Sequence, residues 1–456
     1  MDWQDYVQNG GSEGKPSLKV EYSFDMKGKP VSHEAILRSE SLVHRYLRGV
    51  REFHPNAKHY LLCGFTAAIA RSIFQVAFNL YVYELGYHQD FIGYLNGIPS
   101  LAMLLFALPA SFAVNRAGYK KPAIIGRILS IVGLLGIPLV NSKMLLLIFR
   151  LLDGIGATFI WAVGVPLLMR YSDDNDRVFL FSVNSALQMG SAFLGSIMGG
   201  LVPQVVGRIV SVSPKDILPL RVALFMSVLF IVISIVPLTL LKEERRGASR
   251  QASYSSLIMA LPQDKEDIFV FAKVLLPTIV TALGAGAMVP FFQLFFSLRF
   301  NLSTAPIGAI FAFSGIVSGV VTLAAPLLAK RFGKVKLIAV TRLASIPFLL
   351  TLAHSLNLPA VVASYYFRHA FMNMCGPVET TFFLEQVREE QRATLHSVRG
   401  VLDSLVRGGL APFISGILQV KGGFPLAFSM TAVCYLISTS MFYCFFRSTE
   451  KVPEAH

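Results

Sequence analysis

The sequence predicts an all-α membrane protein whose twelve transmembrane helices form two pseudo-symmetric six-helix bundles. Its 456 residues are 54% hydrophobic and 15% charged, whereas a soluble domain carries about 25% charged residues. Twelve apolar runs are long enough to cross a hydrocarbon core, which takes about 20 helical residues. Landmarks of the first half also recur in the second half at a fixed spacing. These observations predict that lipid surrounds most of the chain.

Each apolar run is expected to form one helix, because backbone polar groups cannot stay unpaired in lipid. The predicted spans cover residues 60–84, 92–114, 122–140, 144–168, 179–206, 220–241, 270–298, 306–329, 335–354, 358–384, 396–420 and 425–446. They divide the chain into a tail (1–58), a first bundle (59–241), a connection (242–268), a second bundle (269–447) and a short tail (448–456). The first tail lacks the apolar core of a signal peptide, and within it Ser41–Val50 has the spacing of an interfacial helix.

The charges of the loops predict the orientation of the helices. With both termini in the cytoplasm, eleven basic residues fall in short inner loops and five in outer loops, as the positive-inside rule requires. The inner ones are Arg116, Lys120, Lys121, Arg170, Arg177, Lys330, Arg331, Lys334, Lys336, Arg388 and Arg392, and the outer ones are Lys143, Arg208, Lys215, Arg299 and Lys421. We therefore expect a multi-pass protein of the plasma membrane with cytoplasmic termini. The net charge of +14 is spread over these loops, so we expect no nucleic-acid partner.

The sequence lacks the motifs of an enzyme. It contains no phosphate-binding loop, no nucleotide-binding glycine fingerprint, no His-Glu-x-x-His helix and no recognisable nucleophile triad. The four cysteines, Cys63, Cys375, Cys434 and Cys444, lie in apolar segments without paired spacing, which favours neither a disulfide framework nor a zinc site. We expect no catalytic residue, no metal and no cofactor.

The two halves share landmarks at one offset. Ile92-Gly93 recurs as Ile307-Gly308, Arg116-x-Gly118 as Arg331-x-Gly333, Arg127 as Arg342, and Arg177 with Ser182-Val183 as Arg392 with Ser397-Val398, each displaced by 215 residues. Halves with an even number of spans repeat in parallel, so an axis along the membrane normal should relate the two bundles. Such bundles are expected to enclose a cavity.

The loop after the second predicted span resembles a motif of the major facilitator superfamily. Residues 111–121 read Ser-Phe-Ala-Val-Asn-Arg-Ala-Gly-Tyr-Lys-Lys, against the family's Gly-x-x-x-Asp-Arg-x-Gly-Arg-Lys between helices 2 and 3. Arg116, Gly118 and Lys120 match, whereas Ser111 and Asn115 replace Gly and Asp. In the family this loop is a latch that stabilises the outward-open state.

The second half holds a degenerate copy of this loop. It keeps Arg331, Gly333 and Lys334 but has Lys330 at the acidic position. The resemblance implies the twelve-helix fold of the family from about residue 59 onward. It also implies a conformational latch made of Asn115, Arg116, Gly118, Lys120, Arg331 and Gly333.

Two further segments resemble motifs of the same family. Arg150 to Ala157 resembles Arg-x-x-x-Gly-x-Gly-Ala, whose arginine is implicated in coupling in proton-coupled members. Residues 195–200 resemble the antiporter motif Gly-Pro-x-x-Gly-Gly, with Ser196 in place of proline, which weakens the case for an exporter. Gly195, Gly199 and Gly200 are interpreted as positions of close helix packing.

Polar residues within the spans predict where a substrate binds, since a charge at mid-bilayer costs about 2.5–3.5 kcal/mol and is expected to face a cavity or the bundle interior. Arg71, Gln75 and Asn79 share one helix face in the first span, and Gln293 is the near-counterpart of Asn79 in the seventh. Arg368 and Asn373 complete the predicted substrate cavity. Two alternatives stay open: Arg71 pairs with a carboxylate such as Asp153 or Glu379, and Gln293 makes a hydrogen bond between helices.

Buried carboxylates predict how transport is coupled to a proton gradient. Glu379 is the first choice for a proton carrier, with Asp153 and Arg150 as further coupling residues. The alternatives are ion pairs without a coupling role, namely Arg368 with Glu379 and Arg150 with Asp153. Arg399 and Asp403 are predicted to form a structural pair of the same kind.

The function that follows is secondary transport by alternating access, in which the bundles rock about a site near the midplane. We expect a monomer that exports a small organic solute with protons as the coupling ion. Two alternatives remain: a membrane receptor or assembly factor of the same fold that transports nothing, and a lipid transporter whose cavity opens sideways to the bilayer.

Overall fold

The computed structural model describes residues 50–172, 174–242 and 264–449. The chain divides into two units, Met1–Phe53 and His54–His456. Of the first unit only residues 50–53 are described, and residues 50–52 are helical. The predicted interfacial helix lies outside the described residues except for Val50, as do most of both predicted tails and of the central connection.

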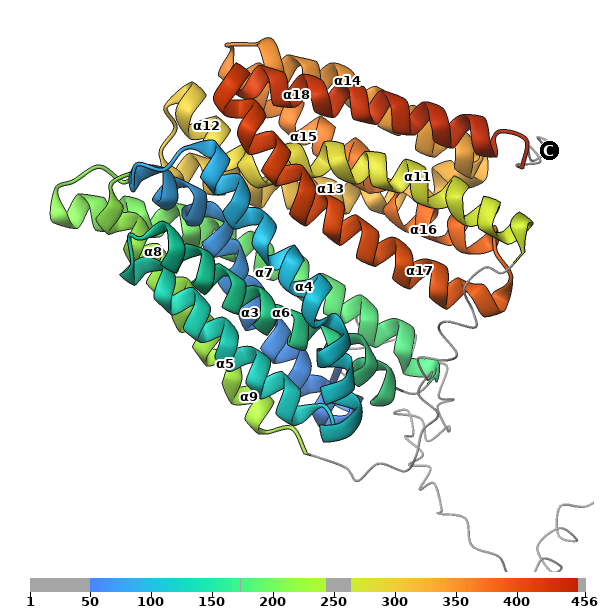
Figure 1. The fold of residues 1–456 in the computed structure, drawn as a ribbon, viewed down its shortest axis with the longest axis horizontal. Helices are drawn as coiled ribbons and strands as arrows, with labels where there is room; N and C mark the ends of the chain where they lie inside the picture. The colour runs from blue at the N-terminus through green and yellow to red at the C-terminus, as the bar shows by residue number, and fades with distance from the viewer. Residues whose placement is uncertain (1–49, 173, 243–263, 450–456) are drawn as a thin grey trace, which may run out of the picture. The chain divides into compact units, whose positions relative to one another are not determined.

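The second unit contains two sets of helices, shown from blue to light green and from yellow to red in Figure 1. The first set is α3 (Pro55–Glu84), α4 (Gln89–Ala117), α5 (Lys120–Gly136) with the 3₁₀ turn η2 (Ile137–Leu139), α6 (Lys143–Arg170), α7 (Asp174–Val210), α8 (Ile217–Ile233) and α9 (Ile235–Thr239). The second set is α11 (Lys265–Met288), the 3₁₀ turn η3 (Val289–Phe291), α12 (Phe292–Phe300), α13 (Thr304–Phe332), α14 (Lys334–His354), α15 (Leu358–Met374), α16 (Gly376–Glu385), α17 (Glu389–Asp403), the π-helical segment η4 (Ser404–Leu410) and α18 (Ala411–Phe446).

These helices make twelve spans in the described part of the chain, as the sequence predicts. Ten stretches are long and apolar enough to cross a membrane, and one of them, Glu389–Phe446, covers 58 residues. That stretch holds two spans, because Gly423 adopts φ 67° and turns the chain between them. The twelfth span is α15 followed by α16, which are separated at Cys375, where Pro377 cannot continue the hydrogen-bond pattern of the preceding helix.

The first span starts at Pro55 rather than at the predicted residue 60. Pro55 fits the first turn of a helix, and the Nδ1 atom of His54 accepts a hydrogen bond from the backbone N–H of Asn56 at 3.1 Å. The side chain of Asn56 also exchanges two hydrogen bonds with the backbone of Lys242, at 2.9 and 3.0 Å. Capping and this contact with the end of the sixth span extend the helix beyond its apolar run.

The internal duplication is visible in the helix boundaries. Helices α4, α6 and α7 begin at residues 89, 143 and 174, and α13, α15 and α17 begin 215 residues later, at 304, 358 and 389. Gly118 and Gly333 close α4 and α13 with φ of 80° and 86°, a conformation that favours glycine. Both halves therefore use the same backbone turn at the loop that resembles the family motif.

The two bundles contact each other through glycines at one end, called here the closed end, where α3 ends and α4 begins. A Cβ atom on Gly93 of α4 would lie 2.5 Å from the carbonyl oxygen of Pro412 in α18. In the repeat-related contact, a Cβ on Gly308 of α13 would overlap the carbonyl oxygen of Ser196 in α7. The helices of the two bundles diverge toward the opposite end (Figure 1). Close backbone approach thus holds the bundles together at the closed end.

Gly308→Ala is expected to lower the unfolding free energy by about 1–3 kcal/mol, because the new methyl group would overlap α7. The change should appear as a lower thermal unfolding temperature of the purified protein. Gly315→Ala is the matched control on the same helix, since a Cβ there would meet no heavy atom within 4 Å. Equal unfolding temperatures for the two variants would contradict this account of the interface.

Candidate functional site: a cationic cavity at the bundle interface

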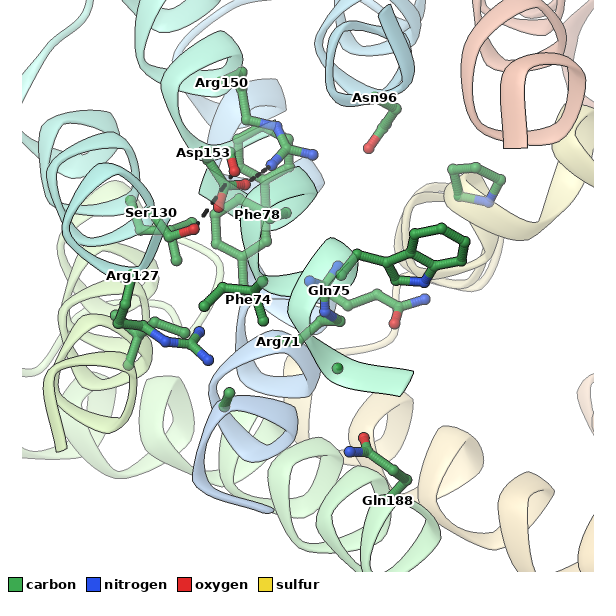
Figure 2. Close-up of a pocket in the computed structure, with 18 of the residues that line it drawn as sticks. Arg71, Phe74, Gln75, Phe78, Asn96, Arg127, Ser130, Arg150, Asp153 and Gln188 are labelled. Atoms are coloured by element: carbon green, nitrogen blue, oxygen red, sulfur yellow. Dashed lines mark hydrogen bonds and ion pairs between the residues drawn. The ribbon is translucent and has the colours of Figure 1, made fainter. Parts of the chain in front are cut away.

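A cavity of about 430 Å³ lies within the first bundle and reaches the second. Helices α3, α5, α6 and α7 form most of its wall, and η3 and α12 contribute Val289, Pro290 and Gln293. It runs from Asn79 and Asn96 near the closed end to residues near the other ends of α3 and α6, such as Tyr60 and Leu168. Figure 2 shows its polar side chains.

Amide side chains close one end of this cavity. Asn79 donates a hydrogen bond from Nδ2 to the carbonyl oxygen of Pro290 at 2.5 Å, and Asn96 donates to Oδ1 of Asn79 at 3.1 Å. Pro290 lies in the 3₁₀ turn that separates α11 from α12. Gln293 is buried beside it, with its Oε1 atom unpaired among the described residues. This row of amides links α4, α3 and the second bundle, so it separates the cavity from the closed end.

Arg71 and Gln75 lie on the cavity wall one helical turn apart, and both are exposed to its interior (Figure 2). Neither side chain forms a hydrogen bond or ion pair with another described residue. The alternative in which Arg71 pairs with Asp153 or Glu379 is wrong, because arginines from other helix positions occupy both carboxylates. Arg71 is therefore free to contact a solute.

Arg150 and Asp153 form the predicted pair on α6. The Nη1 atom of Arg150 lies 2.6 Å from Oδ2 of Asp153, and its Nε donates to the carbonyl oxygen of Leu95 at 3.2 Å. The guanidinium also lies 5.1 and 5.0 Å from the ring centroids of Phe74 and Phe78. Arg150 is thus held in place from three sides, whereas Asp153 keeps part of its carboxylate on the cavity.

The cavity carries an excess of positive charge. Arg71, Arg127 and Arg150 line it together with one carboxylate, that of Asp153. Opposite charges are strongly attracted in a site of low dielectric constant, so this wall favours a solute with an anionic group. Among the residues that the structure describes, no group of three or more His, Cys, Asp or Glu side chains is arranged to hold a metal ion.

Arg368 and Asn373 do not line this cavity, which corrects the predicted substrate set. Arg368 is 2% exposed, donates a hydrogen bond to the hydroxyl of Tyr435 on α18, and stacks over the ring of Phe292. Asn373 donates to the carbonyl oxygen of His369, one turn earlier on its own helix. Helix periodicity identified the polar positions of α15, but a tyrosine from a distant span supplies the partner of Arg368.

Glu379 lies between two arginines in the second bundle. Its Oε2 is 2.6 Å from Nη2 of Arg342 on α14, and its Oε1 is 2.9 Å from Nη2 of Arg399 on α17. The predicted pair of Glu379 with Arg368 is therefore wrong, and so is that of Arg399 with Asp403. Asp403 instead pairs with Arg407, at 2.8 Å. A proton-carrying role for Glu379 stays a prediction.

The residues of the predicted latch lie at the ends of α4 and α13 away from the closed end. Asn115, Arg116 and Arg331 are exposed, and in the described part of the chain neither Arg116 nor Arg331 forms an ion pair. Arg331 lies over the ring of Phe332, at 5.4 Å. Lys120 begins α5 directly after the Gly118 turn. Among the residues that the structure describes, the charged latch residues thus form no ion pair in this conformation.

The three glycines interpreted as packing positions lie on α7. A Cβ atom on Gly195 would be 2.6 Å from the carbonyl oxygen of Ile69 on α3, and one on Gly199 would be 3.0 Å from the Cα of Ile73. Gly200 faces α13, where its carbonyl oxygen accepts a hydrogen bond from the hydroxyl of Thr304 at 2.8 Å. Gly200 therefore takes part in the contact between bundles.

Several residues that line the cavity were not predicted from the sequence to do so. Arg127, Asn184, Gln188 and Trp161 all line the wall. Arg127 was visible as a landmark of the repeat, and Asn184 and Gln188 as polar residues one turn apart in an apolar span. The face of α5 or α7 that borders the cavity depends on how the helix is rotated about its axis. A span that is apolar on all sides has no hydrophobic periodicity that would reveal this rotation.

Known proteins resemble the chain in sequence and in fold. A family model described as Major Facilitator Superfamily matches residues 60–408 and 278–456. Among solved structures, a bacterial homologue of the human lysosomal transporter Spinster, inward-facing and unoccupied, has a TM-score of 0.69 at 16% identity, covering 86% of this chain and 96% of that one. The nucleoside transporter NupG has a TM-score of 0.64 at 12% identity, covering 87% and 99%. The human organic anion transporter MFSD10 has 0.58 at 14%, covering 85% and 99%. No curated protein matches the chain.

Glu379→Gln is expected to lower the unfolding free energy by about 3–5 kcal/mol, because it leaves the buried guanidinium of Arg342 and the partly exposed one of Arg399 without a carboxylate. Thermal unfolding of the purified protein measures the change. Glu385→Gln is the matched control, because Glu385 pairs with Lys334 at an exposed position and should contribute less than about 1 kcal/mol. Equal losses of unfolding free energy in the two variants would show that the triad around Glu379 stabilises the fold no more than an exposed ion pair does.

Proposed function

Because the chain belongs to the major facilitator superfamily, we propose that it is a secondary active transporter that moves a small organic anion across the membrane by alternating access. The chain is a multi-pass integral membrane protein of a transporter family. The substrate, the coupling ion and the direction are parts of the proposal. They are supported by the cavity, the charge pattern and the buried carboxylates.

Arg71 is the observation that carries the proposal. A guanidinium at mid-bilayer is costly unless water, a counter-charge or a ligand meets it. Arg71 faces the cavity with no carboxylate partner among the described residues, and Gln75 beside it offers hydrogen-bond donors and an acceptor. This arrangement suits a solute that brings its own negative charge.

The rest of the cavity wall is evidence that the substrate also has an apolar organic part. Phe74, Phe78 and Trp161 line the cavity, and Trp161 is 66% exposed. The exposed ring of Trp161 offers apolar surface to a ligand, whereas Phe74 and Phe78 are buried beneath Arg150. The volume of about 430 Å³ falls in the range of about 300–1,000 Å³ typical of sites for small molecules. The human neighbour MFSD10 is described as an organic anion transporter, which is compatible with this charge.

The direction of transport in this proposal is export from the cytoplasm. With the termini cytoplasmic, as the loop charges predict, the closed end faces outward and the cavity extends toward the cytoplasm. An exported solute would bind in this conformation first. We further propose a monomer in the plasma membrane.

Proton coupling is assigned to Asp153 and Arg150 in this proposal. Asp153 is the carboxylate on the cavity wall, paired to one arginine, whereas two arginines hold Glu379 outside the cavity lining. Protonation of Asp153 would release Arg150 from its ion pair and add to the positive charge of the wall. A proton and an anionic solute would thereby favour each other's binding at one place, so they would be exported together.

Arg71→Gln is expected to reduce gradient-driven flux of organic anions in proteoliposomes at least about tenfold, the effect of losing roughly 1.4 kcal/mol of binding. Radiolabelled carboxylates and their neutral amides form the panel, and Arg208→Gln, exposed at the end of α7, is the control. Wild-type protein that moves no compound under any gradient would favour the receptor or assembly-factor alternative. Tight retention of lipid in native mass spectra, without flux of the panel, would favour the lipid transporter.

Asp153→Asn is expected to abolish accumulation driven by a pH gradient while leaving exchange of solute across the membrane, because the variant cannot bind the coupling proton. Uptake with and without the gradient measures the first quantity, and counterflow measures the second. Glu379→Gln tested in parallel distinguishes the two carboxylates. Gradient dependence that survives in Asp153→Asn but disappears in Glu379→Gln would assign the proton to Glu379 instead.

A further inference from the structure

The charged triad of the second bundle has a counterpart in the first. The offset of 215 residues relates Arg342, Glu379 and Arg399 to Arg127, Gly164 and Asn184. The same offset relates the start of α6 to that of α15 and the end of α6 to that of α16. The correspondence therefore holds along the whole span that contains Gly164 and Glu379.

In the second bundle the triad is complete. Glu379 is 7% exposed and bonds to Arg342 and Arg399 at 2.6 and 2.9 Å. In the first bundle the arginine remains, but glycine stands at the position of the carboxylate and asparagine at that of the second arginine. The first bundle has lost the anion of the triad and kept its buried cation.

Arg127 is consequently a buried guanidinium without a counter-charge among the described residues. It is 5% exposed, its Nε atom has no hydrogen-bond partner, and Nη2 donates to the sulfur of Cys63 at 3.2 Å. A neutral thiol is a weak acceptor. Burying a charge without an anion is costly, so the site gains most from a ligand that supplies one.

The residues of the first bundle that are equivalent to the triad line the cavity. Arg127, Gly164 and Asn184 all line it, as does Tyr60. A Cβ atom on Gly164 would overlap the hydroxyl of Tyr60, so this hydroxyl occupies the place that a side chain at position 164 would take. Figure 2 shows Arg127 on α5 with its guanidinium directed into the cavity. A solute in the cavity can therefore contact Arg127 next to the hydroxyl of Tyr60.

We propose that the substrate carries a carboxylate and that this group binds Arg127 from the cavity, beside the hydroxyl of Tyr60. Asn184 and Tyr60 are the neighbouring hydrogen-bond donors. The inference rests on the proposed function and deepens it, because it names the acidic group and its subsite. Arg71 lines the same cavity, so it adds positive charge to the wall while the carboxylate binds Arg127.

Thermal unfolding of the purified full-length chain tests this assignment. The probes are sodium acetate, benzoate and 1-naphthoate, each beside its neutral amide, with total salt held constant by sodium chloride. In wild-type protein the carboxylates, but not the amides, should raise the unfolding temperature by about 2–4 °C. Arg127→Gln should lose this shift. Arg342→Gln, which changes the equivalent buried arginine of the other bundle, should keep it.

A second variant covers the case in which Arg127→Gln does not fold. Asn184→Asp adds a fixed carboxylate to the cavity wall that Arg127 also lines, so it should raise the unfolding temperature without ligand and abolish the shift by carboxylates. Asn184→Ser is its uncharged control and should do neither. Loss of the effect of Asn184→Asp in the Arg127→Gln background would show that the two positions are coupled.

Several outcomes overturn the inference. They are no shift of wild-type protein by any carboxylate, an equal shift by the amides, an undiminished shift in Arg127→Gln, and the absence of both expected effects in Asn184→Asp. An equal shift when sulfate replaces chloride would mean that the subsite takes any free anion rather than the carboxylate of a substrate. Flux that depends on Arg71 but not on Arg127 would refute this subsite alone. Absence of flux would refute the proposed function, whatever the unfolding temperatures are.

Discussion

A charge inside the hydrocarbon layer must meet a counter-charge or water, and this constraint organises the interior of the protein. The second bundle meets it internally, since Glu379 lies between Arg342 and Arg399 away from the cavity. The first bundle meets it differently, since Arg71 and Arg127 border a cavity that holds a single carboxylate. The same requirement thus gives one bundle a buried ion triad and the other a cationic chamber.

Because of this difference, the two repeat-related halves have different roles. The triad joins α14, α16 and α17 into one unit, in which each charge has a partner of opposite sign. The first bundle provides most of the chamber wall, and the second contributes a short segment around Pro290 and Gln293. In the transport cycle that we propose, a solute would contact mainly the first bundle, while the second moves against it.

The contacts between the bundles are made largely by backbone atoms, which suits movement of one bundle against the other. Glycines on α4 and α13 approach carbonyl groups of the opposite bundle, and the bond from Asn79 to Pro290 crosses the same interface. Small residues allow close packing without interlocked side chains, so the two surfaces can separate without repacking a core. The helix break at Pro290 supplies the carbonyl that Asn79 binds, which connects an irregular segment of backbone with closure of the chamber.

The sequence by itself determined the twelve spans, the duplication and the presence of a polar chamber, because hydropathy and a fixed offset are local or periodic properties. It also placed Arg71, Gln75 and Asn79 on one helix face and offered the pairing of Arg150 with Asp153. Both are relations between residues of a single helix, which sequence spacing determines. Only the tertiary structure decided the partners of Arg368, Glu379 and Asp403, and showed that Arg127 and Asn184 border the cavity. The physical reason is that a helix apolar on all sides carries no signal for its rotation, so a charge can find its partner on any neighbouring span.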